Sequence, residues 1–146
     1  MPHNSITRLR LRSLLTLPAF ARETRVISEQ LRAAPGFLGG AVLAEGWLVF
    51  WTRSAWESAD AMKAFRDSGA HRASMPKLLD WCDEAAVAQS EGEALTDWDA
   101  IYALLSEKGR LSRVRKPTKA HEEKRFARMV RWSPEQVIAP ANRRGG

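Results

Sequence analysis

The sequence predicts one α+β domain with the ferredoxin-like order β-α-β-β-α-β, in which two helices cover one face of a four-stranded antiparallel sheet. Two observations lead to this prediction. Four stretches have the apolar pattern of strands, and two stretches with helical spacing separate them in this order. The chain has 146 residues and a hydrophobic content of 45%, which suits a single domain with one core.

The first strand and the first helix are expected at residues 7–13 and 18–31. Threonine and leucine alternate with arginine in residues 7–13, which is the period of a strand with one apolar face. Residues 18–31 carry apolar side chains at near-helical spacing. Pro18 suits the first turn of that helix, and Pro35-Gly36 ends the segment.

Strands two and three form a predicted antiparallel hairpin. Residues 37–44 are an apolar run with two glycines, Glu45-Gly46 makes the turn, and residues 47–53 are the third strand. Both faces of this third strand carry large apolar side chains, and we expect both faces to be covered. One face holds Trp47, Val49 and Trp51, and the other holds Leu48 and Phe50.

The second helix is expected to begin at Ser54, which offers an N-cap with Glu57 as its capping-box partner. Its apolar stripe would consist of Ala55, Ala59, Met62 and Phe65. We expect Gly69 to end this helix, a short helical piece at residues 76–81, and the fourth strand at residues 82–89. Asp83 and Glu84, near the start of that strand, are interpreted as solvated.

The rest of the chain predicts helices and a basic extension. Residues 97–108 have an amphipathic helical pattern that ends at Gly109. Residues 119–132 show a weaker helical stripe, and residues 139–146 are expected to be disordered.

The net charge lies in this C-terminal part. Residues 1–108 hold 12 Lys and Arg against 14 Asp and Glu, whereas residues 109–146 hold 11 against 3. We therefore divide the chain into a ferredoxin-like domain with an added helix, residues 1–109, and a basic extension, residues 110–146. Because the folded part is nearly neutral, a nucleic-acid partner is not expected. We interpret the extension as an arm across a second subunit, with an anionic-surface binder and a solubilising extension as alternatives.

Several classes of protein are excluded by the sequence. No apolar run approaches the roughly 20 residues that span a bilayer, so a membrane protein is not expected. Arginines interrupt the first 13 residues where a secretory signal would be apolar, and we expect a cytoplasmic location. The lone Cys82 cannot form an internal disulfide, and it lacks the further cysteines and histidines that a zinc site needs beside it.

A homodimer is also predicted. The two expected helices cover one face of the sheet, and the second apolar face needs another cover. A second copy of the chain is the simplest one.

The segment FWTRSAWESADAMKAFRDSGAHRASMPKLLDWCDEA, residues 50–85, resembles the antibiotic-biosynthesis-monooxygenase-like branch of the dimeric α+β barrel superfamily. The resemblance covers roughly residues 5–117, and the block WESADAMKAF with SGAHRASM is also similar to spheroidene-monooxygenase-like proteins. It implies two ferredoxin-like subunits packed sheet against sheet, each with a pocket between its sheet and its helices.

The superfamily includes cofactor-independent quinol oxygenases, haem-degrading enzymes, haem-dependent oxygenases and members without known activity, so the resemblance leaves the activity open. Haem-degrading members use an asparagine on the first strand together with a tryptophan and a histidine. Here that strand offers Ser5 and Thr7, and Asn4 lies just before it, which disfavours haem degradation.

His71 is the best candidate for chemistry, because it follows Gly69 where the pocket of the family opens. Its imidazole suits a general base or a haem axial ligand. The alternative is that His71 caps the second helix or bonds a backbone carbonyl. Arg72 and Arg53 are candidates for holding an anionic group or a haem propionate, or else for surface ion pairs with Glu57 or Asp67.

The predicted substrate pocket is formed by Trp51, Trp56, Phe65, Met75 and Trp81. The alternative for the tryptophans is a place in the core or the dimer interface. We expect no cofactor or a haem, with Trp51 and Arg53 beside it and with His71 as the only metal ligand. The first hypothesis is a monooxygenase-like enzyme for a small aromatic or polyene substrate. The second is a non-catalytic dimeric barrel that binds a small ligand or a protein partner.

Overall fold

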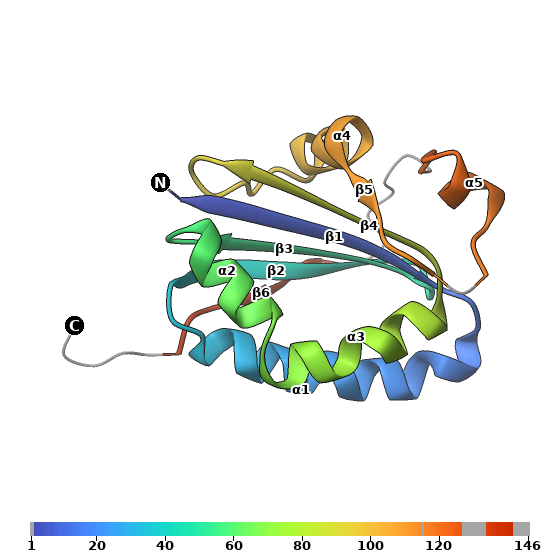
Figure 1. Ribbon diagram of the computed structural model, residues 1–146, viewed down its shortest axis with the longest axis horizontal. Coiled ribbons are helices and arrows are strands. Elements are labelled where there is room, and N and C mark those ends of the chain that lie inside the picture. Colours follow the sequence, from blue (N-terminus) through green and yellow to red (C-terminus); the bar gives the residue numbers. More distant parts are fainter. Residues whose placement is uncertain (1, 115, 127–133, 142–146) are drawn as a thin grey trace.

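The computed structural model describes residues 2–114, 116–126 and 134–141, and it contains one antiparallel sheet with helices on both faces (Figure 1). The strand order is β5-β4-β1-β3-β2-β6. The four central strands have the predicted order and orientation, and a short strand is added at each edge. The predicted bounds of the first strand are wrong, because it begins at His3 and includes Asn4, which pairs with Ala55. The strands are β1 (His3–Leu11), β2 (Phe37–Glu45), β3 (Val49–Trp56), β4 (Cys82–Glu91), β5 (Arg110–Leu111) and β6 (Gln136–Ile138).

Three helices cover one face of the sheet: α1 (Leu17–Ala33), α2 (Ala59–Arg66) and α3 (Gly69–Trp81) (Figure 1). A 3-10 turn, η1 (Leu14–Thr16), precedes α1. Two clusters of buried apolar side chains lie between these helices and the sheet. The first predicted helix is therefore confirmed, and the predicted ferredoxin-like layer of helices is present.

The predicted start of the second helix is wrong, because β3 continues through Trp56 and α2 begins only at Ala59. Its N-cap is Ser58, whose Oγ accepts a hydrogen bond from the Ala61 amide at 3.1 Å. The backbone around Ser54 is instead engaged in the sheet, where β3 pairs with both β1 and β2. Ser54 and Ser58 offer the same local signal, and the strand pairing selects the second.

The predicted short helical piece is longer than expected. Gly69 has φ +57° and starts α3 rather than merely ending α2. Pro76 lies inside α3. A proline there removes a hydrogen bond to the carbonyl of Arg72, and Arg72 lies on the exposed side of the helix, where water can bond that carbonyl.

The arginines of β1 do not form a solvated face. Arg8 is 3% exposed, and its Nη1 donates to Glu84 Oε1 at 2.8 Å. Arg10 pairs with Asp83. The interpretation of Asp83 and Glu84 as solvated is therefore wrong, because both carboxylates are buried beside arginines of the neighbouring strand.

The second face of the sheet is covered by the same chain, mainly by α4 (Trp98–Lys108), which Figure 1 shows on the side opposite α1, α2 and α3. The predicted helix at residues 97–108 is thereby confirmed, with Asp97 as its N-cap. The buried cluster on this face consists of Ile6, Ala41, Leu43, Trp51, Ala86, Ala88, Trp98, Ile101, Leu105 and Phe126. The premise of the dimer prediction, an uncovered second face, is therefore wrong.

The C-terminal extension also lies on its own chain. β5 pairs with β4 at one edge of the sheet, and β6 pairs with β2 at the other. Along the chain, α5 (Lys119–Glu122) lies between these two strands. Near the end of the described residues, the amide of Ala141 donates to the carbonyl of Arg32 at 2.8 Å. The described part of the extension is thus not an arm held away from its own domain.

Two predictions for the extension lie partly outside the described residues. The helical pattern at residues 119–132 yields only the four-residue α5, and residues 127–133 are outside the described part. Of residues 139–146, expected to be disordered, only 139–141 are described. In the described ranges, no helix is long and apolar enough to cross a membrane.

Candidate functional site

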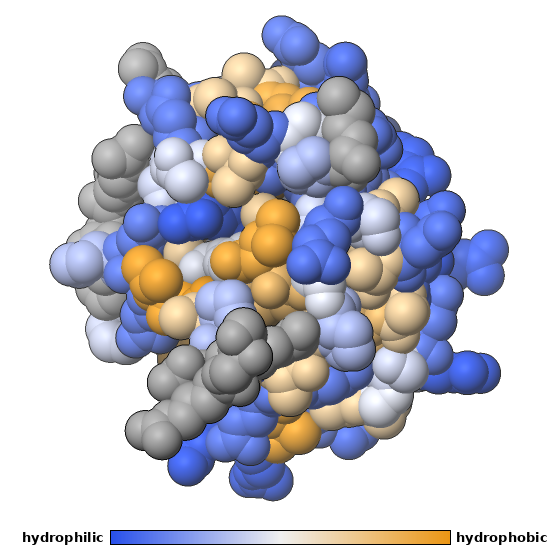
Figure 2. Space-filling view, turned by 90° about the vertical axis from the view of Figure 1, so that its left-hand side faces the viewer, coloured by the Kyte–Doolittle hydropathy of each residue, from blue (hydrophilic) through white to orange (hydrophobic). Residues whose placement is uncertain are grey.

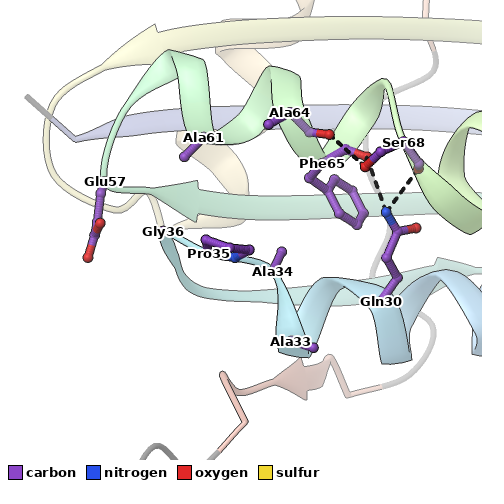
Figure 3. Close-up of a pocket in the computed structure, with 10 residues that line it drawn as sticks. All are labelled: Gln30, Ala33, Ala34, Pro35, Gly36, Glu57, Ala61, Ala64, Phe65 and Ser68. Atoms are coloured by element: carbon purple, nitrogen blue, oxygen red, sulfur yellow. Dashed lines mark hydrogen bonds between the residues drawn. The ribbon is translucent and has the colours of Figure 1, made fainter.

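A pocket of about 490 Å³ lies between the C-terminal end of α1, the start of β2 and helix α2 (Figure 3). Its walls are largely apolar. Figure 2 views the molecule from the left-hand side of Figure 1 and shows apolar side chains gathered in the centre of this face, with hydrophilic ones around them. The pocket is lined by Gln30, Ala33, Ala34, Pro35, Gly36, Glu57, Ala61, Ala64, Phe65 and Ser68.

Small residues bring the two sides of the pocket together. Gly36 has φ +82°, and a Cβ atom at this position would lie 2.7 Å from the Cβ of Ala61. The turn before β2 can therefore approach α2 only with glycine at this point. Ala33, Ala34 and Ala64 have short side chains, which leave space between the helices that larger residues would fill.

Gln30 joins α1 to the end of α2. Its Nε2 donates to the carbonyl oxygens of Phe65 at 3.3 Å and Ser68 at 3.0 Å, and its Oε1 accepts from the amide of His71 at 2.8 Å (Figure 3 shows the first two bonds). The hydroxyl of Ser68 donates to the carbonyl of Ala64 at 2.7 Å. These bonds hold this end of the pocket in one geometry.

His71 lies beside the pocket in the first turn of α3. Its Nδ1 lies 3.0 Å from the carbonyl oxygen of Arg66, so Nδ1 carries the proton and donates it to this carbonyl. Burial lowers the pKa of His71 below its usual value, against the hydrogen bond to Arg66, which raises it. His71 is therefore neutral at pH 7. The alternative interpretation, that His71 bonds a backbone carbonyl at the end of the second helix, is confirmed.

Aromatic rings link the core to the pocket. The ring centroids of Trp56 and Phe65 are 5.3 Å apart, and those of Phe65 and His71 are 5.0 Å apart. Phe37 packs on the other side of Trp56 at 5.4 Å. Trp56 is fully buried, and its Nε1 donates to Ser54 Oγ at 2.9 Å. Of the predicted pocket residues, Trp56, Phe65 and His71 are thus brought together.

Trp51 and Arg53 lie on the opposite face of the sheet, away from this group. Trp51 is packed in the cluster under α4, and its Nε1 donates to Glu45. Arg53 donates to both carboxylate oxygens of Glu135, and its guanidinium lies 5.9 Å from the Trp98 ring centroid. Their predicted place in the pocket is wrong, because alternate residues of β3 point to opposite faces. The predicted alternative partners of Arg53 are wrong as well.

The remaining candidates are also separated from the pocket. Met75 and Trp81 pack into the cluster around Leu11 and Cys82, below another part of the sheet. Arg72 is exposed on α3. None of these three residues lines the pocket. Gln30 and the alanines of the pocket lining were missed in the sequence analysis. Gly36, in the turn before β2, was the one sequence signal for this part of the pocket.

A second polar group lies between β1, β4 and the C-terminal extension. The hydroxyl of Thr118 donates to Glu84 at 3.2 Å, and the amide of Ala85 donates to His121 Nδ1 at 3.2 Å. Together with the Arg8–Glu84 pair these bonds fix the extension to the sheet. Burial raises the pKa of Cys82 to about 12, so its thiol is not reactive near neutral pH. Across the described residues, no group of three potential ligands is placed to hold a metal ion.

Solved structures share this fold. One is SnoaB, a cofactor-independent oxygenase from Streptomyces nogalater, solved as a single-residue variant: it is 12% identical, has a TM-score of 0.55, and the match covers 66% of this chain and 98% of that one. Rv0793 from Mycobacterium tuberculosis is 14% identical with a TM-score of 0.59, and the match covers 66% of this chain and 100% of Rv0793. A provisionally named antibiotic biosynthesis monooxygenase from Nitrosomonas europaea is 18% identical with a TM-score of 0.58, and the match covers 66% and 94% of the two chains.

These similarities confirm the resemblance at the level of the fold. No protein-family model matches the sequence, and a search of curated proteins gives no match. Because the matches cover nearly all of the other chains, about one third of this chain has no counterpart in them. The similarity to spheroidene-monooxygenase-like proteins has no counterpart among these structures.

Proposed function

We propose that the protein binds a small, largely apolar molecule in the pocket between α1 and α2 and oxidises it with dioxygen. The observation that supports this proposal is the apolar pocket of about 490 Å³ next to the Trp56–Phe65–His71 row of rings. Sites for small molecules are typically concave and apolar with a few polar groups. The fold shared with the oxygenase SnoaB is consistent with such a role.

The chemistry would need a substrate that reduces dioxygen without a cofactor. In such a reaction a ring CH₂ group and O₂ give a C=O group and water, and the substrate supplies all four electrons. The protein has to accept the first proton. His71 is not part of the pocket lining, so in this proposal its Nε2 takes the substrate proton through a bridging water. Nε2 is free of a proton near neutral pH because the pKa of His71 is lowered and its proton lies on Nδ1. Arg72 is exposed on α3 and outside the pocket lining, so it has no direct part in this proton transfer.

The residues present do not fit a haem. None of the described arginines, lysines and histidines lines the pocket, so none of them is placed as an axial ligand or as a partner for the propionates. Arg53 and Trp51, the residues expected beside a haem, lie on the other face of the sheet. The proposed reaction therefore involves no haem.

A non-catalytic binding protein is the second candidate. Two observations favour it. The Nδ1 proton of His71 is used to bond a backbone carbonyl at the end of α2, and Glu57 is the one titratable residue among the described residues of the pocket lining. A pocket of this kind can hold a ligand without transforming it.

The two candidates are separated by binding and oxygen-uptake measurements on the same protein. Anthrone, which carries a ring CH₂ group between two aromatic rings, serves as an oxidisable apolar probe. Ala64→Phe fills the pocket from the exposed side of α2 and should abolish binding and uptake, whereas Ala103→Phe on the exposed side of α4 should change neither. Binding without enzyme-dependent oxygen uptake favours the second candidate, and binding that Ala64→Phe leaves intact contradicts both.

The oligomeric state is a separate proposal. The sequence predicted a homodimer through the second sheet face, which is now seen to be covered by α4 and Phe126. Dimerisation through that face would require these segments to be displaced, at the cost of exposing a buried cluster. We propose that the chain closes its own sheet and remains a monomer.

A further inference from the structure

We infer that the pocket between α1 and α2 selects ligands that carry a positively charged amino group on an apolar body. The inference rests on the proposed function, since it names the class of ligand for the same pocket. It follows from the donors, acceptors and charges around the pocket.

Glu57 supplies a carboxylate at one end of the pocket. Figure 3 shows its side chain beside the turn that holds Gly36, and Glu57 Oε2 lies 3.6 Å from the position that a Cβ atom at Gly36 would occupy. In the ranges 2–114, 116–126 and 134–141, no hydrogen bond or ion pair engages this carboxylate. Its negative charge is therefore free to meet a ligand.

The side-chain donors around the pocket are already used. Both protons of the Gln30 amide go to carbonyls, those of Phe65 and Ser68, and the hydroxyl of Ser68 goes to the carbonyl of Ala64. Among the residues that the structure describes, no lysine, arginine or histidine belongs to the lining. A ligand in this pocket thus meets side chains that can accept hydrogen bonds and none with a free proton to donate.

The C-terminal end of α1 adds to the negative potential. Gln30 and Ala33 belong to the last turn of this 17-residue helix. Carbonyl groups without intrahelical partners give such an end a partial negative charge. The eight-residue α2 borders the pocket from Glu57, next to its N-cap Ser58, to Phe65 in its last turn, so its two ends oppose each other there.

Two arginines of these helices, Arg32 of α1 and Arg66 of α2, bond to groups outside the pocket lining. Arg32 Nε donates to the carbonyl of Ala139 at 3.3 Å, and Arg66 pairs with Asp67 at 2.9 Å. Neither guanidinium belongs to the pocket lining, so a ligand in the pocket does not contact them. The Phe65 ring lines the pocket and can pack against the apolar body of a ligand (Figure 3). The site therefore favours an organic ammonium ion over a neutral molecule of the same shape and disfavours a carboxylate.

Calorimetric titration of the full-length protein with three ligands of similar shape tests this inference. Phenethylamine is cationic, phenethyl alcohol is neutral and hydrocinnamate is anionic. We expect phenethylamine to bind about three- to tenfold more tightly than the alcohol, and hydrocinnamate to bind most weakly. The advantage of the amine should shrink as salt is added, because Glu57 lies at the exposed end of the pocket.

Glu57→Gln should remove most of the preference for the amine and leave the affinity for the alcohol unchanged. The matched control is Glu107→Gln, on the exposed side of α4, which should alter neither affinity. Equal binding of amine and alcohol by the unaltered protein, or tighter binding of the carboxylate, overturns the inference and leaves the proposed pocket standing. Failure of all three ligands to bind overturns the inference and counts against the proposed function as well.

Discussion

The imidazole Nδ1 of His71 lies 3.0 Å from the carbonyl oxygen of Arg66, and this bond ties the first turn of α3 to the last turn of α2. The backbone amide of His71 also donates a hydrogen bond to Gln30 Oε1 on α1, at 2.8 Å. Three helices therefore meet at one residue. Because Phe65 and Ser68 stand at this junction and line the pocket, its geometry depends on the bonds of His71.

Replacement of His71 should make stability less dependent on pH. Burial lowers the pKa of His71 in the folded protein below its usual 6.5, so the unfolded chain takes up a proton first as the pH falls. The folded protein should thus lose stability as the pH falls from about 6.5 towards the folded-state pKa. Urea unfolding at several pH values should show a smaller decrease for His71→Asn than for the unaltered protein. Equal slopes contradict this assignment.

Gly36→Ala should destabilise the protein by about 1–3 kcal/mol. Alanine is strained at φ +82°, and its Cβ would also lie 2.7 Å from Ala61. Gly46→Ala is a matched control, since Gly46 has φ +65° and nothing within 4 Å of its Cβ position. Urea unfolding should show the larger loss for Gly36→Ala. Equal losses would mean that the close approach to α2 contributes nothing.

Glu84→Gln should cost about 3 kcal/mol or more, because it leaves the buried guanidinium of Arg8 without its counter-charge. Arg8 also lies 4.9 Å from the Phe126 ring centroid, so the loss should loosen the extension over the sheet. The comparison is Glu29→Gln, which removes an exposed pair with Arg25 and should cost less than about 0.5 kcal/mol. Thermal unfolding measures both, and a small effect of Glu84→Gln would contradict the buried pair.

The full chain should sediment as a monomer of 16.4 kDa at low micromolar concentration. Trp98→Asp, which places a charge in the cluster beneath α4, should loosen the cover of the second face. This variant is expected to be less stable and to self-associate. A stable dimer of the unaltered chain in the same experiment would restore the dimer predicted from the sequence.

The sequence predicted the order of the central elements because periodicity and turn residues act locally. It placed the start of α2 four residues too early, since Ser54 and Ser58 have the same capping chemistry and only pairing with β1 separates them. In the sequence analysis, the cover of the second sheet face was assigned to another subunit for a similar reason. The apolar stripe of α4 is visible in the sequence, but the surface against which it packs is not.

The candidate site was predictable only in part. Trp56, Phe65 and His71 follow one another along one stretch of chain, and the structure places them together. Gln30 comes from a distant segment, and its bonds to the end of α2 depend on how α1 packs. Trp51 was misplaced because large residues on both faces of β3 gave no sign of which face carries the pocket.

The most direct test of the central claim is a two-dimensional amide NMR titration of the isotope-labelled full chain with phenethyl alcohol. If the pocket between α1 and α2 is the binding site, the shifted amides should cluster at residues 30–36 and 57–71, with none on α4. The same titration of Ala64→Phe should show no such shifts. Shifts that centre on α4 or on the C-terminal extension, or none at saturating ligand, would contradict the account.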